Sequence, residues 1–237
     1  MNSKTGFRCL RIALVAVWIA AIPTVGRAIP VVAPLSGFTD FAIAGTSVAL
    51  RPELAGLILY DQSQAFSFID ANGRDVAGSV QVRIVKSNVD STLDFYWRIL
   101  NSSESGSAIT AFRVGGFDSF ALDADWRSDG LGTQSPNTAR VFGDGSLGFV
   151  NFLFDSNPVG RGQESTFFFL DTQATAFAPT AIYDLIATET RTGLTTISEL
   201  YSAQAPAAIP EPQTYLMLLA GLGALSVAMR RRTVNKT

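Results

Sequence analysis

The stretch Leu93-Asp94-Phe95-Tyr96-Trp97-Arg98-Ile99 alternates large apolar side chains with mostly polar ones. Successive side chains of a β-strand point to opposite faces, so this period of two predicts a strand with its odd-numbered residues in the core and its even-numbered residues largely in water. Residues 80–84 repeat the pattern as Val-Gln-Val-Arg-Ile. A polar stretch at 102–106 leads into the apolar run 109–114, and this order predicts a turn that joins two strands in a hairpin.

Short runs of the same kind continue from Val48 to Leu200. Runs at 147–154, 166–170 and 181–188 are separated by turn residues such as Gly143-Asp144-Gly145 and Asn157-Pro158. Strands at this spacing are typical of a β-sandwich. The sequence shows no internal repeat, which disfavours a solenoid. The sequence therefore predicts an all-β fold built as one antiparallel β-sandwich.

Phenylalanine is concentrated in these later runs. Clustered phenylalanines within strands lie in a core far more often than on a binding surface, although a binding surface is the alternative interpretation. We interpret six of them as core residues: Phe149, Phe152, Phe154, Phe167, Phe168 and Phe169.

The first residues have the three parts of a secretion signal. Basic Lys4, Arg8 and Arg11 precede an apolar run at 12–22, and the small-residue site Gly26-Arg27-Ala28 follows. A retained membrane anchor is the alternative, but this run is far shorter than the roughly 20 residues that a spanning helix needs. The sequence therefore predicts a signal peptide at 1–28, handled by the secretion translocon and cut by signal peptidase after Ala28.

Two residue types that carry much of enzyme chemistry are missing from the expected mature chain. The sequence has no histidine, and its one cysteine, Cys9, lies within the expected signal peptide. This excludes Ser-His-Asp and Cys-His catalysis and disulfide stabilisation. With 47% hydrophobic and 16% charged residues in 237, the chain is expected to form one main folded domain stabilised by its apolar core, without a cofactor.

Charge is segregated along the chain. Eight of the 18 basic residues lie in the two ends and all 20 acidic residues lie between Asp40 and Glu211, so residues 29–211 carry a formal charge of −10. Such a domain has no positive field to attract a polyanion. We therefore expect no nucleic-acid partner.

Three acidic residues are weak candidates for a calcium site. Asp123, Asp125 and Asp129 lie in a Gly/Asp-rich segment that we interpret as a loop, where they would otherwise be solvated turn residues. Arg127 takes the third ligand position, so the segment is not an EF-hand loop. Asp123 and Asp125 could instead serve a two-carboxylate hydrolase, and Trp126 between charged neighbours could be an exposed platform for a sugar ring.

The tail combines three features in order. Pro210-Glu211-Pro212 and Thr214 precede an uncharged apolar run from Tyr215 to Met229, which Arg230, Arg231 and Arg232 follow. The prolines favour an extended, accessible strip, and a 15-residue helix would cover about 22 Å of a hydrocarbon core roughly 30 Å thick. We predict a single, short C-terminal transmembrane helix with its arginines in the cytoplasm. A permanent anchor, a buried core helix and a chance Pro-Glu-Pro in a linker are the alternatives.

This order of features resembles the PEP-CTERM sorting signal. The resemblance covers roughly the last 29 residues and says nothing certain about residues 29–205. It implies an exosortase-like partner, a membrane transpeptidase-like enzyme of Gram-negative bacteria that make exopolysaccharide. It also implies a transient stage in the inner membrane, a final place at the cell surface or outside the cell, and exopolysaccharide as a further partner.

We therefore expect a non-enzymatic exported protein in three parts: a signal peptide at 1–28, a β-sandwich at 29–205 and a sorting signal at 206–237. A carbohydrate- or ligand-binding module that uses the same route is the first alternative. A two-carboxylate or metal-dependent hydrolase is the second.

Overall fold

The computed structural model describes residues 29–32, 34, 36–117, 122–143, 148–207 and 222. The expected signal peptide, including Ala28, lies outside these residues, and so do Pro210, Glu211, Pro212, Thr214 and the three arginines at 230–232. Within the described part of the chain, no helix is long and apolar enough to cross a membrane. The expected transmembrane helix at 215–229 falls almost wholly outside it.

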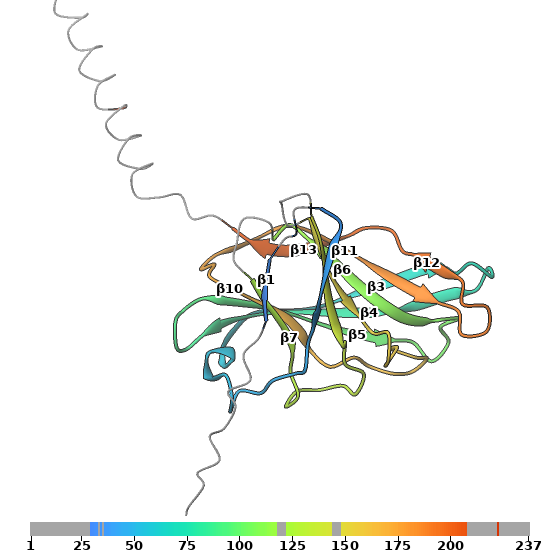
Figure 1. The fold of residues 1–237 in the computed structure, drawn as a ribbon, viewed down its shortest axis with the longest axis horizontal. Coiled ribbons are helices and arrows are strands. Elements are labelled where there is room, and N and C mark those ends of the chain that lie inside the picture. The colour runs from blue at the N-terminus through green and yellow to red at the C-terminus, as the bar shows by residue number, and fades with distance from the viewer. Residues whose placement is uncertain are drawn as a thin grey trace, which may run out of the picture.

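Two antiparallel sheets form the folded domain (Figure 1). In order from edge to edge, the six-stranded sheet A contains β1 (Ile29–Val31), β7 (Leu122–Trp126), β10 (Phe168–Thr172), β5 (Leu93–Asn101), β4 (Asp75–Ser87) and β3 (Gly56–Ile69). The seven-stranded sheet B contains β12 (Thr195–Ile197), β11 (Phe177–Thr188), β6 (Ala108–Gly115), β9 (Phe149–Leu153), β8 (Thr138–Phe142) and β2 (Phe38–Ala42), with β13 (Tyr201–Pro206) also paired to β11. The predicted all-β antiparallel fold is confirmed.

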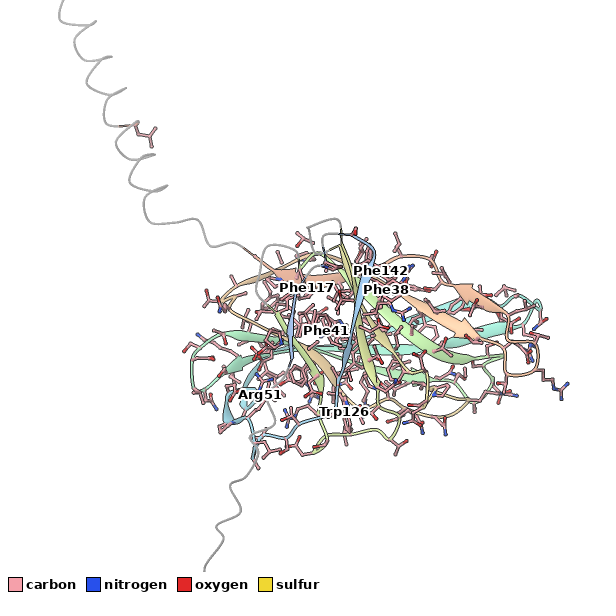
Figure 2. All side chains as sticks on the ribbon, in the orientation of Figure 1. Phe38, Phe41, Arg51, Phe117, Trp126 and Phe142 are labelled. Carbon is pink, nitrogen blue, oxygen red and sulfur yellow. The ribbon has the colours of Figure 1, made fainter. Side chains whose placement is uncertain are left out.

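Aromatic side chains join the two sheets. The Trp97 ring of sheet A lies 5.6 Å from Phe112 and 6.5 Å from Phe152 of sheet B, measured between ring centroids. Phe168 lies 4.7 Å from Phe152 across the same interface, and Phe117, labelled in Figure 2, lies 5.8 Å from Trp97. The phenylalanines interpreted as core residues are buried, except Phe149, which is half-buried. The two sheets thus form a sandwich around one aromatic core.

The predicted hairpin between residues 93–99 and 109–114 is wrong. β5 pairs with β4 and β10, whereas β6 pairs with β9 and β11, so the polar stretch between them crosses from one sheet to the other. The Asn101 side chain supports this crossing because its Nδ2 donates to the carbonyls of Ser107 at 3.0 Å and Val159 at 2.9 Å. Alternation identifies both strands but does not say which strands are neighbours.

The alternation of β5 predicted an outer face largely in contact with water, and this prediction is wrong. Asp94 and Tyr96 are only 1% and 2% exposed, because residues 46–55 pass over this face. We call residues 46–55, which contain the short 3-10 helix η1 (Pro52–Leu54), the cover segment. Its Leu54 forms a second apolar cluster on sheet A with Val85, Tyr96, Phe167 and Phe169.

The longest pair of strands, β3 and β4, forms a hairpin whose turn is built around Asp70. Its Oδ1 accepts the N–H groups of Asn72 and Arg74, each at 2.9 Å, and its Oδ2 accepts the Ser107 hydroxyl at 2.7 Å. Burial acts to raise the pKa of Asp70, but these hydrogen bonds outweigh it and lower that pKa to about 2. Gly73 takes the left-handed conformation that closes the turn, with φ of 76°.

Candidate functional site

A row of three carboxylates crosses the outer face of sheet A. The strand register places Asp94 opposite Asp171, and Asp171 opposite Asp123. Arg51 of the cover segment, labelled in Figure 2, makes ion pairs with two carboxylates of this row. Its Nη2 donates to Asp171 and lies 3.9 Å from an Asp123 oxygen, and its Nε donates to Glu53 at 2.7 Å. One guanidinium therefore holds carboxylates from three segments of the chain.

Two carboxyl groups of the row, those of Asp94 and Asp171, have raised pKa values. Burial, reinforced by the charge of Asp171, raises the pKa of Asp94 to about 9. Burial also raises the pKa of Asp171, although the adjacent Arg51 opposes that rise. Asp94 is thus protonated at neutral pH and provides the proton of its hydrogen bond with Asp171, whose charge Arg51 balances.

This row borders a cavity of about 320 Å³ under β1. Asp90, Asp123 and Asp171 line the cavity, while Asp94, which carries the proton, lies behind them and is 1% exposed. A neutral acid beside an ionised one is the arrangement that acid–base hydrolysis requires. Here the proton-bearing group is screened from the cavity and the ionised group is held by Arg51.

The three calcium candidates do not share one site. Asp123 and Asp125 lie in β7 rather than in the loop that we expected, and Asp129 lies in the turn that follows. Asp125 accepts the N–H groups of Gly45 at 2.8 Å and Trp126 at 2.9 Å. Asp129 accepts the Val48 N–H at 2.9 Å and Arg127 Nε at 2.6 Å.

Protein donors thus occupy Oδ1 of Asp125 and both carboxylate oxygens of Asp129. Across the described ranges, no group of three or more acidic, histidine or cysteine side chains is arranged to hold a metal ion. Calcium binding by Asp123, Asp125 and Asp129 stays a prediction.

Trp126 is half-buried rather than exposed, so the expectation of an open platform is wrong (Figure 2). Its ring packs against the core and is covered by Gly45, where a Cβ would overlap the indole. Gly45 has a φ of 84°, a conformation that glycine adopts without strain. The local sequence shows the charged neighbours of Trp126 but not the glycine 81 positions earlier that covers its ring.

A second cavity, of about 420 Å³, lies between the cover segment and residues 127–131. Arg83 lies 4.7 Å from the centre of the Phe167 ring, and Arg127 lies 6.0 Å from that of Tyr96. Asp61 holds Arg83 and Asp129 holds Arg127, so each cation is oriented by a carboxylate. The cavity thus combines an apolar floor with charged walls, a pattern that suits small amphipathic ligands.

Sequence comparison identifies one part of the chain. No curated protein and no solved structure matches it significantly. A family model does match, over residues 208–232, immediately after Ala207 at the end of β13. The matched segment contains Pro210-Glu211-Pro212 and Arg230-Arg231-Arg232, and it indicates an exported, membrane-processed protein with an exosortase-type processing partner. The protein therefore carries, at residues 208–232, a PEP-CTERM protein-sorting motif.

Proposed function

We propose that this protein is a non-enzymatic exported protein of the cell surface or the extracellular space, sorted by an exosortase-type system in a Gram-negative bacterium that makes exopolysaccharide. The sorting motif at residues 208–232 is the observation that carries this proposal. The remaining steps of the route are a signal peptide removed after Ala28, a transient stage in the inner membrane and separation of the tail near Pro210–Pro212.

The fold suits this route. The core side chains of the described fold lie within residues 29–207, and the last described strand, β13, ends at Pro206, just before the matched segment. Removal of residues beyond 207 would take away none of the core side chains of the described fold. The core contains no cysteine, so the domain can be exported without oxidative folding.

The chemistry of the described carboxylates supports a non-enzymatic role. Asp94 and Asp171 share a proton behind Arg51, and Asp125 and Asp129 accept hydrogen bonds from the protein. A hydrolase needs an accessible acid and base within reach of a substrate. A two-carboxylate or metal-dependent hydrolase is therefore less well supported than a structural or binding protein.

A ligand-binding module that uses the same route is the second candidate, with carbohydrate as one ligand class. The cavity of about 420 Å³ beside Arg83 and Arg127 favours it. Binding of a soluble oligosaccharide or organic acid by the exported protein, lost in Arg83→Ala, would support this candidate. Release of reducing ends from a polysaccharide by the same preparation would support the hydrolase instead.

The experiment that tests sorting changes Pro210-Glu211-Pro212 to three alanines in the native host. If the motif directs processing, the variant should keep its tail and accumulate in the inner membrane, while the wild type appears outside it without the peptide 215–230. A plain membrane helix depends on apolar length and on the arginines, so the same change would leave size and location unaltered.

Gln213→Ala, which lies between the Pro-Glu-Pro triplet and Thr214, is the matched control and should be processed like the wild type. Fractionation with peptide mapping of both termini is the measurement. Recovery of the 215–230 peptide from wild-type protein at the cell surface would replace the sorting proposal with permanent anchoring.

A further inference from the structure

β3 forms one edge of sheet A and is unusually open for an edge strand. Over the described residues, its strand partner is β4 alone, so its other side presents unpaired backbone groups. Natural proteins usually protect such edges with short strands, lysines or prolines. β3 is 14 residues long and contains neither lysine nor proline. Leu57 and Ile69, near its two ends, are 63% and 55% exposed.

The sequence of β3 is close to symmetrical about Ser63. Gln62 and Gln64 flank it at one residue, and the aromatic residues Tyr60 and Phe66 stand at three residues on either side. If two copies of β3 paired antiparallel about Ser63, each Gln62 would oppose Gln64 of the other copy and each Tyr60 would oppose Phe66. Opposed aromatic and amide pairs are among the cross-strand contacts that stabilise sheets.

The side chains of this symmetrical stretch are oriented for such pairing. Tyr60, Gln62 and Gln64 stand opposite the core residues Ile84, Val82 and Val80 of β4, so they point toward the space between the sheets. The same three side chains line a cavity of about 200 Å³ at the open rim of the sandwich. Glutamines stand where core residues would be expected. An amide ladder between two copies would give them polar partners at that rim.

Charge does not oppose the pairing locally. Asp61 is the only charged residue of β3, and in this register it would oppose Ala65 rather than a second Asp61. Its carboxylate is held by Arg83 Nη2 and Gln81 Nε2, each at 2.7 Å, on the outer face of the sheet. A bulge between Ile58 and Tyr60 interrupts the ladder at one end, so the regular pairing would extend over residues 60–66.

We propose that two copies of this protein associate through antiparallel pairing of their β3 edges about Ser63, which joins two copies of sheet A into one continuous sheet. This inference goes beyond the proposed function and does not depend on how the chain is sorted. Over residues 60–66, the pairing satisfies the free backbone groups of both edges.

A single introduced cysteine tests the register. In the pairing about Ser63, the two copies of residue 63 face each other with Cα atoms about 4.5 to 5.5 Å apart, which a disulfide can bridge. Ser63→Cys in the full chain, expressed in the native host, should therefore yield a covalent dimer of the exported protein. The measurement is a non-reducing gel with mass mapping of the linked peptide.

Ala65→Cys is the matched control because it lies on the same strand and is also exposed. In the proposed register, the two copies of residue 65 are offset by four residues, or about 13 Å, and cannot be bridged. The proposal requires at least a tenfold excess of the covalent dimer in Ser63→Cys over Ala65→Cys. Equal linkage in both variants, or monomer in both, overturns it.

A second variant keeps the test independent of thiol chemistry. Ser63→Lys places two ammonium groups opposite each other at the centre of the pairing, at an exposed position that the fold does not need. In sedimentation of the exported protein, the wild type should be a dimer and Ser63→Lys a monomer with an unchanged circular dichroism spectrum. A wild-type monomer, or a dimer that survives this change, also overturns the proposal.

Discussion

The two faces of β5 are buried in different ways. On the inner face, Trp97 contacts Phe112 of the facing sheet, Phe95 contacts Phe117 just beyond β6, and Ile99 belongs to the same buried cluster. On the outer face, Asp94 and Tyr96 are buried beneath the cover segment, within a network of charges. The inner face is stabilised by excluded water and close packing. The outer face combines the small apolar cluster around Leu54 with a balance of buried charges.

This comparison shows that equal burial does not imply equal response to change. An apolar residue removed from the inner face leaves a cavity, and its cost scales with the lost volume. A charged residue removed from the outer face leaves its partner buried without a counter-ion. The three variants below test this difference, first by two losses of unfolding free energy in decreasing order and then by a change in pH dependence.

The largest effect is expected for Trp97→Ala. Trp97 is fully buried between the sheets and contacts Phe112, Phe152 and Phe168, so its removal should lower the free energy of unfolding by about 3 to 5 kcal/mol. Trp126→Ala, at a half-buried ring, should cost less. Urea unfolding followed by far-UV circular dichroism compares the two variants, and equal losses would contradict the distinction between them.

Arg51→Ala tests the outer face. It removes the cation that contacts Asp171 and Glu53, and because Asp171 keeps some contact with water we expect a loss of about 2 to 3 kcal/mol. Arg161→Ala is the control, since this exposed arginine contacts only the Ser103 carbonyl among its described hydrogen bonds. Denaturation midpoints that fall equally in both variants would show that the buried network contributes no more to stability than an exposed arginine does.

Asp94→Asn tests whether Asp94 holds the shared proton, through the pH dependence of the unfolding free energy. The folded-state pKa of Asp94 is raised to about 9, so the folded protein keeps a proton that the unfolded chain loses above about pH 4. Stability from this group is fully present below pH 4 and is lost as the pH rises toward 9, by at most about 1.4 kcal/mol per pH unit.

The amide of Asp94→Asn can still donate to Asp171 but does not titrate. The variant should therefore flatten the decline in unfolding free energy between pH 6 and pH 8. Parallel wild-type and variant profiles, measured by urea unfolding at each pH, would assign the proton to another group.

The inner face could be predicted from the sequence and the outer face could not. Period-two alternation placed residues 93, 95, 97 and 99 in the core because the side-chain direction of a strand is a local property. The contact of Arg51 with Asp171 joins residues 120 positions apart, and no local pattern at 46–55 indicates that this segment covers a sheet. β3 could not be predicted from alternation, because polar residues stand on the inner side of this edge strand.

The candidate sites also divide into those that the local sequence predicts and those that it does not. The sorting motif was predictable because its triplet, apolar run and arginines are contiguous. Asp94 and Asp171 come together only through the register of β5 with β10, which pairs residues from distant parts of the sequence. The prediction that Trp126 is exposed is wrong because Gly45, which covers its ring, comes from another part of the chain.

The placement of β13 has a mechanical consequence. The β13–β11 ladder runs from Tyr201 opposite Tyr183 to Pro206 opposite Phe177, and the Ala207 N–H adds a bond to the Ala176 carbonyl at 2.9 Å. A tensile load applied through the chain that follows Ala207 enters the fold at this point. It acts first on the pairs nearest Pro206, which has no N–H to contribute, and next on the irregular register between Ala178 and Ala181. Under the drag of flowing water, a protein held at this end would therefore peel open along the β13–β11 seam from Pro206, and the core side chain of Tyr201 would be pulled from Tyr183 last.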